Sequence, residues 1–481
     1  MQLLKLIKEI NIKKIIGNTD IEIESLVCES EAVTNGCLFF CINGTRIDGH
    51  EYAVQAEKNG AIAIVCQKEQ NVNITQIIVE NVRDTMSVVA GNFYGRADKK
   101  LKIIGITGTN GKTTTTNLIY QMLNSLGYPT ALIGTLGTFF NDRFIEPTLT
   151  TPDPIELHKQ LNEMYVSKIQ YVVMEVSAHA LFFDKIKGID FSIVVFTNFT
   201  HDHLDFFKSM DEYKKAKLKL FSGYNFEYAV TNNDDAVGRE ISSQIENSIS
   251  YGIENPADVF AIRIKEFSNK IEYVVNLFDY VESVKIPLIG RFNVYNSLCA
   301  QTVCSLLGVD AKTTINAINK VSAVCGRLEK VYNGEYSIFI DYAHTPDGLK
   351  KSIVALKKIT KGKVICVFGC GGNRDKLKRY KMGKISGENA DFTIITTDNP
   401  RYEEPMEIMI EIEKGVLSTT KKYLLIEDRK SAIEYAINFA KPQDIILIAG
   451  KGSENYQEVL GIKKPYNDKD TVNEILRSTK N

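Results

Sequence analysis

Short apolar runs separated by polar turns recur along the whole chain, and their lengths are typical of buried strands. Before residue 98 the runs are CLFFCI, AIAIVC and TQIIVE, which predict a small mixed α/β unit. After it, the runs KIIGIT, YVVMEVS and SIVVFTNF occur with segments of helical periodicity between some of them. Such alternation predicts a parallel sheet that is covered by helices on both faces.

A second series of strand-like runs begins near residue 330. It comprises YSIFIDY, KVICVFGC, DFTIITTDN and DIILIAG, and it predicts a Rossmann-like sheet. We therefore expect an α/β protein of three domains: a small N-terminal domain over 1–98, a central parallel-sheet domain over 99–328, and a C-terminal Rossmann-like domain over 329–481. Ligands of such sheets bind beyond the carboxyl ends of the strands.

Composition narrows the class of protein. The length of 481 residues agrees with about three domains of roughly 150 residues. Lys and Arg (58) balance Asp and Glu (59), which argues against a general nucleic-acid or anionic-membrane binder. Charges interrupt the start MQLLKLIKEI, and no apolar stretch approaches the roughly 18 residues of a membrane span. Nine scattered cysteines are typical of reduced thiols in a cytosolic protein, so we expect a cytoplasmic protein without zinc. We also expect a monomer without membrane insertion or a nucleic-acid partner.

The strongest motif is I-T-G-T-N-G-K-T-T-T-T at 106–116, which follows a strand and opens a helix. Glycines let backbone N–H groups converge on a phosphate, and a helix N-terminus adds positive potential. Lys112 is placed to reach the β/γ-phosphates of ATP and Thr113 to ligate Mg²⁺. The strict P-loop pattern is not met, because residue 106 is Ile; the alternative is a glycine-rich turn with a solvated lysine. The expected ATP contacts in this loop are Gly108, Thr109, Asn110, Gly111, Lys112, Thr113 and Thr114.

Polar groups follow several other strands. E-V-S-A-H at 175–179 and N-F-T-H-D-H-L-D at 198–205 end strands of the first series. Y-K-K-A-K-L-K-L-F at 213–221 is a basic amphipathic helix whose lysines the pattern alone leaves in solvent. In the C-terminal series, F-G-C-G-G-N-R-D-K, D-N-P-R and A-G-K-G-S-E-N-Y-Q follow three strands. Three strand ends can converge on one small ligand.

G-T-N-G-K-T after a strand, with these further motifs, resembles the Mur ligase family. Its members are ATP-dependent amide-forming enzymes of peptidoglycan synthesis, with folylpolyglutamate synthetase as a relative. From Leu101 to Gln457 the order and spacing are similar to the ligases that add the third amino acid, and D-N-P-R marks those that add diaminopimelate. The first hundred residues match more loosely, through G-C-L-F-F and D-G-H.

The resemblance implies roles for single residues. It makes Lys112, Lys217, Glu175 and His203 catalytic, with Lys217 carbamylated (N6-carboxylysine). It makes Thr113, Glu175, His203 and the modified Lys217 ligands of Mg²⁺, with Asp202 and Asp205 orienting His203. A plain hydrogen-bonded pair is the alternative for Glu175.

The resemblance also assigns substrate contacts. The UDP-substrate contacts are Ser30, Thr150, Thr151, Ser177 and Lys185. The further nucleotide-side residues are Asn293, Asn296, Arg327 and Asp341, with His344 either there or merely structural. The amino-acid contacts are Arg374, Asp398, Asn399, Pro400, Arg401, Gly450 and Glu454, with a surface role as the alternative for Arg401.

The implied reaction is ATP-dependent addition of meso-diaminopimelate to UDP-N-acetylmuramoyl-L-alanyl-D-glutamate through an acyl phosphate. Five residues depart from the family pattern: Glu31, Ala178, His201, Asn373 and Ser453. They favour the alternative of a divergent paralogue that adds L-lysine or another amino acid to a related carboxylate. A regulatory protein with a degenerate site is a further alternative, which the retained Lys112, Glu175, His203 and Lys217 argue against.

Overall fold

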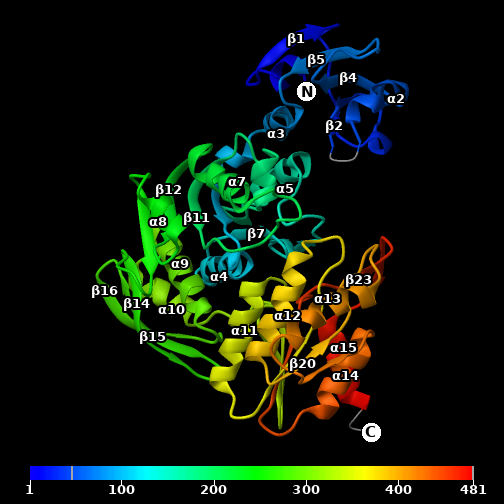
Figure 1. Ribbon diagram of the computed structural model, residues 1–481. Coiled ribbons are helices and arrows are strands. Elements are labelled where there is room, and N and C mark those ends of the chain that lie inside the picture. Colours follow the sequence, from blue (N-terminus) through cyan, green and yellow to red (C-terminus); the bar gives the residue numbers. More distant parts are fainter. Residues whose placement is uncertain (45–46, 479–481) are drawn as a thin grey trace. The chain divides into compact units, whose positions relative to one another are not determined.

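The computed structural model describes residues 1–44 and 47–478 (Figure 1). The chain divides into two compact units, and its central third contributes to both. The first unit comprises 1–107, 127–195 and 215–229, and the second comprises 108–126, 196–214 and the chain from 230 onward.

The N-terminal part of the first unit is a five-stranded sheet in the order β1-β5-β4-β3-β2. β2 to β5 are parallel, and β1 runs antiparallel to β5. Alternate side chains of β3 and β4 point into two separate apolar clusters, so both faces are buried. The elements are α1 (Leu3–Leu6), β1 (Ile12–Ile16), β2 (Ser25–Val27), β3 (Cys37–Phe40), α2 (Ala53–Lys58), β4 (Ala61–Cys66), β5 (Thr75–Val79) and α3 (Val82–Phe93).

Seven strands of a second sheet follow, in the order β12-β11-β6-β10-β7-β8-β9. β10 lies parallel between β6 and β7, which places Glu175 opposite Ile106 at the carboxyl ends. β7, β8 and β9 form an antiparallel meander. The elements are β6 (Lys102–Thr107), β7 (Thr130–Gly134), β8 (Gly137–Phe140), β9 (Arg143–Ile145), α5 (Pro154–Val166), β10 (Tyr171–Glu175), α6 (Ala178–Phe182), β11 (Asp190–Phe196), α7 (Met210–Ser222) and β12 (Asn225–Asn232).

The second unit begins with α4, directly after the phosphate loop, and α9 packs against it. β13 runs parallel to β14, and β14, β15 and β16 are antiparallel. The elements are α4 (Lys112–Ser125), α8 (Ala236–Ser242), β13 (Ser248–Gly252), β14 (Val259–Glu266), β15 (Ile271–Leu277), β16 (Tyr280–Ile286), α9 (Phe292–Leu306) and α10 (Ala311–Ile318).

The C-terminal part of the second unit is a six-stranded sheet in the order β17-β18-β22-β19-β20-β21. β18, β22, β19, β20 and β21 are parallel, and β17 is antiparallel at the edge. A hairpin, β23–β24, follows β22. The elements are β17 (Glu329–Asn333), β18 (Ser337–Asp341), α11 (Pro346–Ile359), β19 (Val364–Phe368), α12 (Leu377–Asn389), β20 (Phe392–Ile395), α13 (Pro405–Leu417), β21 (Tyr423–Leu425), α14 (Arg429–Phe439), β22 (Ile445–Ala449), β23 (Tyr456–Val459), β24 (Ile462–Pro465) and α15 (Asp468–Ser478).

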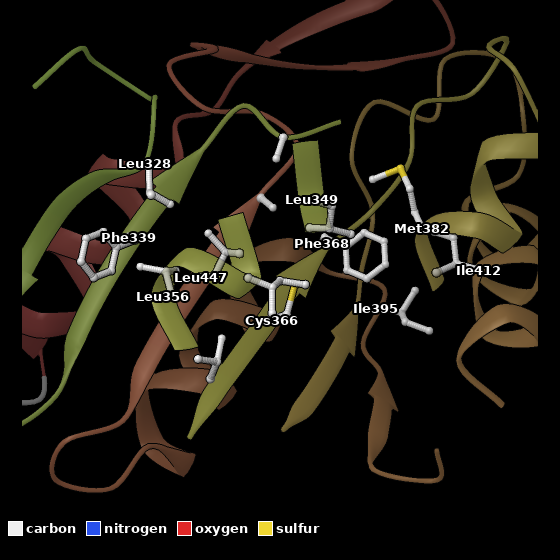
Figure 2. Close-up of a cluster of buried hydrophobic side chains, with 14 of the residues drawn as sticks. Leu328, Phe339, Leu349, Leu356, Cys366, Phe368, Met382, Ile395, Ile412 and Leu447 are labelled. Carbon is white, nitrogen blue, oxygen red and sulfur yellow. The ribbon is translucent and has the colours of Figure 1, made fainter. Parts of the chain in front are cut away.

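Apolar side chains fill both faces of this C-terminal sheet. Figure 2 shows one face, where Cys366, Phe368 and Leu447 of the strands meet Leu356 of α11 and Met382 of α12. Residues between them in sequence form the cluster on the opposite face with α14 and α15. Burial on both faces explains why the strands read as continuous apolar runs.

Helices α12 and α13 approach each other through glycines. A Cβ on Gly383 would lie 2.0 Å from the carbonyl oxygen of Ile412, and one on Gly415 would lie 2.1 Å from that of Tyr380. These distances are far below van der Waals contact, so a larger side chain at either position would force the helices apart.

The expected α/β class and the strands KIIGIT, YVVMEVS, SIVVFTNF and the C-terminal series are confirmed as β6, β10, β11, β18, β19, β20 and β22. The antiparallel extension β14–β16 was not predicted. All nine cysteines lie in the described part of the chain and are free thiols. Across residues 1–44 and 47–478, no helix is long and apolar enough to cross a membrane.

Candidate active site

The phosphate loop between β6 and α4 needs glycine at two positions. Gly108 has a φ of +144°, and a Cβ there would lie 1.9 Å from the hydroxyl oxygen of Thr197. Gly111 has a φ of +87°, and its Cβ would lie 2.6 Å from Oδ1 of Asn296. Both glycines therefore combine a left-handed backbone with a close approach that excludes a side chain.

Lys112 opens α4 and folds back over the loop. Its Nζ donates to the carbonyl oxygens of Gly108 at 2.9 Å and Thr109 at 2.8 Å. The helix N-terminus adds N–H donors and positive potential at the same place. The N-terminus of α4 thus places backbone N–H groups beside an ammonium group, as a phosphate site requires.

Arg327 lies beside the same loop. Its Nη2 donates to Oγ1 of Thr113 at 2.8 Å, and its guanidinium lies 4.4 Å from the ring centre of Tyr342. Its Nε is buried and has no hydrogen-bond partner among the described residues. A buried unpaired donor next to a phosphate loop fits an anionic ligand, because leaving such a donor unpaired is unfavourable.

The other residues expected on the nucleotide side form hydrogen bonds with neighbouring residues of the chain. Asn296 donates to Oδ1 of Asn293 at 2.9 Å, and its own Oδ1 accepts from the Thr115 hydroxyl at 3.3 Å. The buried Asp341 accepts hydrogen bonds from the Leu328 N–H and the Ser352 hydroxyl. Burial raises the pKa of the Asp341 carboxyl. Its contact with ATP stays a prediction.

His203 stands next to a buried carboxylate. Its backbone is left-handed, with a φ of +56°, and its Nε2 lies 3.4 Å from Oδ2 of Asp202. Burial opposes ionisation of Asp202, but His203, His344 and Lys378 hold the pKa of Asp202 at about 2. Asp202 therefore lies within ion-pair distance of the His203 imidazole, and its role in orienting that ring stays a prediction. Asp205 instead lies 3.4 Å from Nη1 of Arg374.

Glu175, in the first unit, is the buried carboxylate at the end of β10. Its Oε1 accepts from the Thr135 N–H at 2.8 Å and its Oε2 from the Thr135 hydroxyl at 3.2 Å. A Cβ on Gly134 would lie 2.4 Å from Oε1. The Thr151 hydroxyl donates to the Glu175 carbonyl oxygen at 2.8 Å and accepts from the Ser177 N–H at 3.0 Å. The predicted Glu175, Thr151 and Ser177 thus form one cluster.

Lys217 is only 2% exposed. The sequence pattern alone predicted a solvated lysine on this basic helix, and that expectation is wrong for Lys217. On the same helix Lys215 is exposed. Burial favours the neutral amine of a lysine, which is the form that attacks CO₂.

The donor chemistry decides whether Mg²⁺ fits. Mg²⁺ prefers oxygen ligands, which Glu175 and a carbamate on Lys217 would supply in the first unit. Thr113 and His203 belong to the second unit. No group of three or more His, Cys, Asp or Glu side chains in the described chain could hold a metal ion by itself. The fit to Mg²⁺ therefore depends on the carbamate.

The expected UDP-substrate residues lie in the first unit. Lys185 forms an ion pair with Asp153 of the T-T-P-D turn at 2.6 Å, and the Thr150 hydroxyl lies 3.2 Å from that of Thr135. Ser30 lies on a short 3₁₀ turn, and within the described chain no hydrogen bond joins it to Thr150 or Lys185.

The sequence analysis missed a pocket of about 590 Å³ in the first unit. Within it, the guanidinium of Arg83 lies 4.7 Å from the ring centre of Phe183 and donates to the Asn43 carbonyl oxygen. The D-G-H motif was the sequence signal closest to this pocket. The ring of its His50 accepts a hydrogen bond from the N–H of Gln67, and Gln67 lines the pocket. The pocket is lined by Asn43, Gly44, Gln67, Glu80, Asn81, Val82, Arg83 and Phe183.

Three loops at the carboxyl edge of the C-terminal sheet converge, as predicted. Asn399, after β20, donates to Oε2 of Glu454 at 2.9 Å. Lys451, after β22, is fully buried and donates to Oδ1 of Asn399 at 2.9 Å and to Oε2 of Glu454 at 2.8 Å. Lys451 was not predicted, although it stands in the G-K-G-S-E motif.

Arg401 belongs to the same edge. Its Nη1 donates to the carbonyl oxygen of Gly372 at 2.8 Å, and its Nε lies 3.2 Å from Oε2 of Glu458. The side chain is 20% exposed and is held by these two contacts, so Arg401 is not a freely solvated arginine; its contact with an amino acid stays a prediction. A Cβ on Gly371 would lie 2.9 Å from Nη1 of Arg401 and 3.7 Å from Cγ of Arg374, so both arginines border this glycine. A Cβ on Gly450 would lie 2.5 Å from Oδ2 of Asp398.

Two of the residues that depart from the family pattern, His201 and Asn373, contact neighbouring residues. His201 lies 3.0 Å from Oδ2 of Asp375, and Oδ1 of Asn373 accepts from the N–H of Tyr402 at 3.1 Å. Glu31 is exposed and Ala178 is buried at the start of α6. Neither replaces one of the residues expected at phosphate or Mg²⁺.

Comparison with known proteins gives matches along the whole chain. Residues 22–95 match the Mur ligase family catalytic domain, 106–304 the Mur ligase middle domain, and 326–452 the Mur ligase glutamate ligase domain. A Clostridium acetobutylicum protein named UDP-N-acetylmuramoyl-L-alanyl-D-glutamate–2,6-diaminopimelate ligase 1 is 42% identical over 99% of both chains. A Bacillus licheniformis ligase of the same name, without the number, is 39% identical over all of both chains.

Solved structures of Mur ligases and of a related synthase have the same fold as this chain. A structure of a UDP-N-acetylmuramoyl-L-alanyl-D-glutamate–2,6-diaminopimelate ligase has a TM-score of 0.72 at 28% identity, covering 100% of this chain and 99% of that one. Folylpolyglutamate synthase of Mycobacterium tuberculosis shares the fold alone, with a TM-score of 0.64 at 16% identity over 76% of this chain and 92% of its own. The three domain matches and the full-length relatives confirm the expected three-domain α/β fold and show that this chain belongs to the Mur ligase family.

Proposed function

We propose that this protein is an ATP-dependent ligase that joins meso-diaminopimelate to UDP-N-acetylmuramoyl-L-alanyl-D-glutamate. The observation that carries the proposal is the arrangement of Arg401, Asn399 and Glu454 at one edge of the C-terminal sheet. Diaminopimelate differs from L-lysine by one distal carboxylate. A partly buried arginine matches that carboxylate, because a guanidinium can bind it through two parallel hydrogen bonds.

ATP would bind at the phosphate loop. The D-glutamyl side-chain carboxylate attacks the γ-phosphorus, which forms an acyl phosphate and releases ADP. The amine of diaminopimelate then attacks the carbonyl carbon, loses a proton and expels phosphate, which leaves the amide. Lys112, the loop N–H groups and Arg327 would stabilise charge on the transferring phosphoryl group. Bound Mg²⁺ would neutralise phosphate charge.

The nucleotide-sugar substrate would use residues of the first unit. Thr150, Thr151, Ser177 and Lys185 offer hydroxyl and ammonium groups to its carboxylate or phosphates. The 590 Å³ pocket near Arg83 has the size and polarity for part of a nucleotide. Ser30 stays in the proposal as a further contact.

We further infer Mg²⁺ as the cofactor and a carbamate on Lys217. The burial of Lys217 and the carboxylate of Glu175 support this inference. The enzyme would act as a cytoplasmic monomer in cell-wall synthesis, and through it in cell shape and division. The proposed domains are 1–98 for the UDP-substrate, 99–328 for ATP, and 329–481 for the amino acid.

The test is ADP release with the UDP-dipeptide and a panel of amino acids that includes meso-diaminopimelate, L-lysine and L-ornithine. Mass spectrometry of the product identifies the new amide. We expect turnover with meso-diaminopimelate and little with L-lysine. Turnover with L-lysine alone would favour the divergent paralogue, and no substrate-dependent ADP release would favour a regulatory protein.

A further inference from the structure

The carboxylate of Glu458 lies beside Arg401. Glu458 belongs neither to the three strand-end loops nor to the motifs found in the sequence. Oε2 of Glu458, on the hairpin strand β23, lies 3.2 Å from Nε of Arg401. Both side chains are 20% exposed, so solvent screens this pair less than a surface ion pair.

The backbones of the two residues are also joined. The Arg401 N–H donates to the Glu458 carbonyl oxygen at 3.1 Å, and the Leu460 N–H donates to the Arg401 carbonyl oxygen at 2.6 Å. Arg401 has a left-handed φ of +54° and forms a parallel bridge with Val459. The Glu458 N–H in turn donates to Oδ1 of Asn399 at 2.9 Å. The hairpin and the D-N-P-R turn therefore hold each other in register.

The guanidinium donors of Arg401 are divided between partners. Glu458 takes Nε, and the Gly372 carbonyl oxygen takes one hydrogen of Nη1. The two hydrogens of Nη2 have no acceptor within the described chain, and Nη1 keeps its second hydrogen. Because Glu458 occupies Nε, a ligand that binds the guanidinium through two hydrogen bonds would use the edge formed by Nη1 and Nη2.

We propose that Glu458 is a positioning residue for the added amino acid, an inference that rests on the proposed function. By holding Nε, it fixes the plane of the guanidinium and presents the Nη1–Nη2 edge to the distal carboxylate. Its own negative charge also disfavours a carboxylate that approaches through Nε. A guanidinium held in its binding geometry loses less conformational freedom when the ligand binds.

Steady-state kinetics of Glu458→Ala and Glu458→Gln test the proposal. We expect Glu458→Ala to raise KM for meso-diaminopimelate by about 10-fold while kcat stays within about twofold and KM for ATP is unchanged. Glu458→Gln keeps an oxygen that accepts from Nε, so it should recover most of the affinity. The matched control Glu474→Gln removes a carboxylate from an exposed ion pair with Lys430 and should leave all constants unchanged.

The outcomes separate this inference from the proposed function. A wild-type enzyme that does not use meso-diaminopimelate overturns the proposed function and this inference with it. An active wild type with an unchanged KM in Glu458→Ala overturns the role of Glu458 alone. A parallel loss of kcat, ATP affinity and thermal stability in both variants also overturns it, because that pattern indicates a merely structural carboxylate.

Discussion

Nη2 of Arg327 donates a hydrogen bond to Oγ1 of Thr113 over 2.8 Å, although the two residues are 214 positions apart in sequence. Thr113 is the second residue of α4, and Arg327 precedes the C-terminal sheet. The expected metal ligand and the expected phosphate contact are therefore joined by a hydrogen bond within the chain. The buried Nε of Arg327 still lacks a partner in the described structure.

Arg327→Ala should therefore weaken ATP binding. We expect KM for ATP to rise by about 10-fold or more, because a charge-assisted contact to phosphate is lost. KM for diaminopimelate should change little, because Arg327 is assigned to another ligand. Kinetics with each substrate varied in turn check this, and a selective loss of diaminopimelate affinity would contradict the assignment.

Lys112→Ala should abolish turnover and leave the fold intact. The ammonium group lies over the phosphate loop, where it would act mainly in the transition state, so its loss should slow ADP release by at least about 10²-fold. The exposed Lys312 on α10 gives a control, since Lys312→Ala removes the same charge elsewhere. Circular dichroism verifies folding, and activity within about tenfold of wild type would refute the role.

Lys217→Ala should be inactive and should regain activity with added formate or acetate, which replace the carbamate oxygens. Depletion of CO₂ should slow the wild type, and bicarbonate should restore it. Lys215→Ala, on the exposed side of the same helix, should respond to neither treatment. A well-resolved unmodified amine in a crystal structure with substrates bound would argue against carbamylation.

Arg401→Ala should raise KM for meso-diaminopimelate by about 10²-fold or more, because the distal carboxylate loses its bidentate partner. Affinity for ATP should be nearly unchanged. Arg477→Ala, at an exposed position of α15, is the matched control. Use of L-lysine by the wild type as readily as diaminopimelate would remove the basis for this assignment.

Arg429→Ala should strongly destabilise the C-terminal sheet. Arg429 is buried, and its Nε and Nη2 each lie 2.8 Å from an oxygen of the fully buried Asp468. Removal of the arginine leaves that carboxylate buried and unpaired, which costs about 3–5 kcal/mol. Urea denaturation measures the effect. Lys430→Ala, which breaks the neighbouring exposed pair with Glu474, should shift the midpoint little; equal shifts would contradict the prediction.

The sequence predicted those parts of the fold and of the candidate site that a short motif or an apolar run marks. Gly108 and Gly111 mark the phosphate loop, and buried strand ends mark where Glu175 and Asn399 stand. Lys217 shows the limit of periodicity, because the same basic pattern contains one buried and several accessible lysines. Only the family resemblance singled it out.

Other features depend on contacts between distant segments. The pair of Arg401 and Glu458 spans 57 positions and exists because the β23 hairpin pairs with the D-N-P-R turn. The pocket at Arg83 likewise needs Phe183, from a segment about a hundred residues away. Neither juxtaposition follows from spacing or periodicity, since both are set by tertiary packing.

The glycine contacts between α12 and α13 have a consequence for substrate choice. α12 follows the loop of Arg374, and α13 follows the loop of Arg401. Gly383 and Gly415 let the two helix backbones lie close together, so a side chain at either position would move α12 against α13 and would move the loops that precede them. The proposed function places both loops at the amino acid, so we expect a methyl group added at Gly383 or Gly415 to change which amino acids are accepted, although neither glycine belongs to the proposed site.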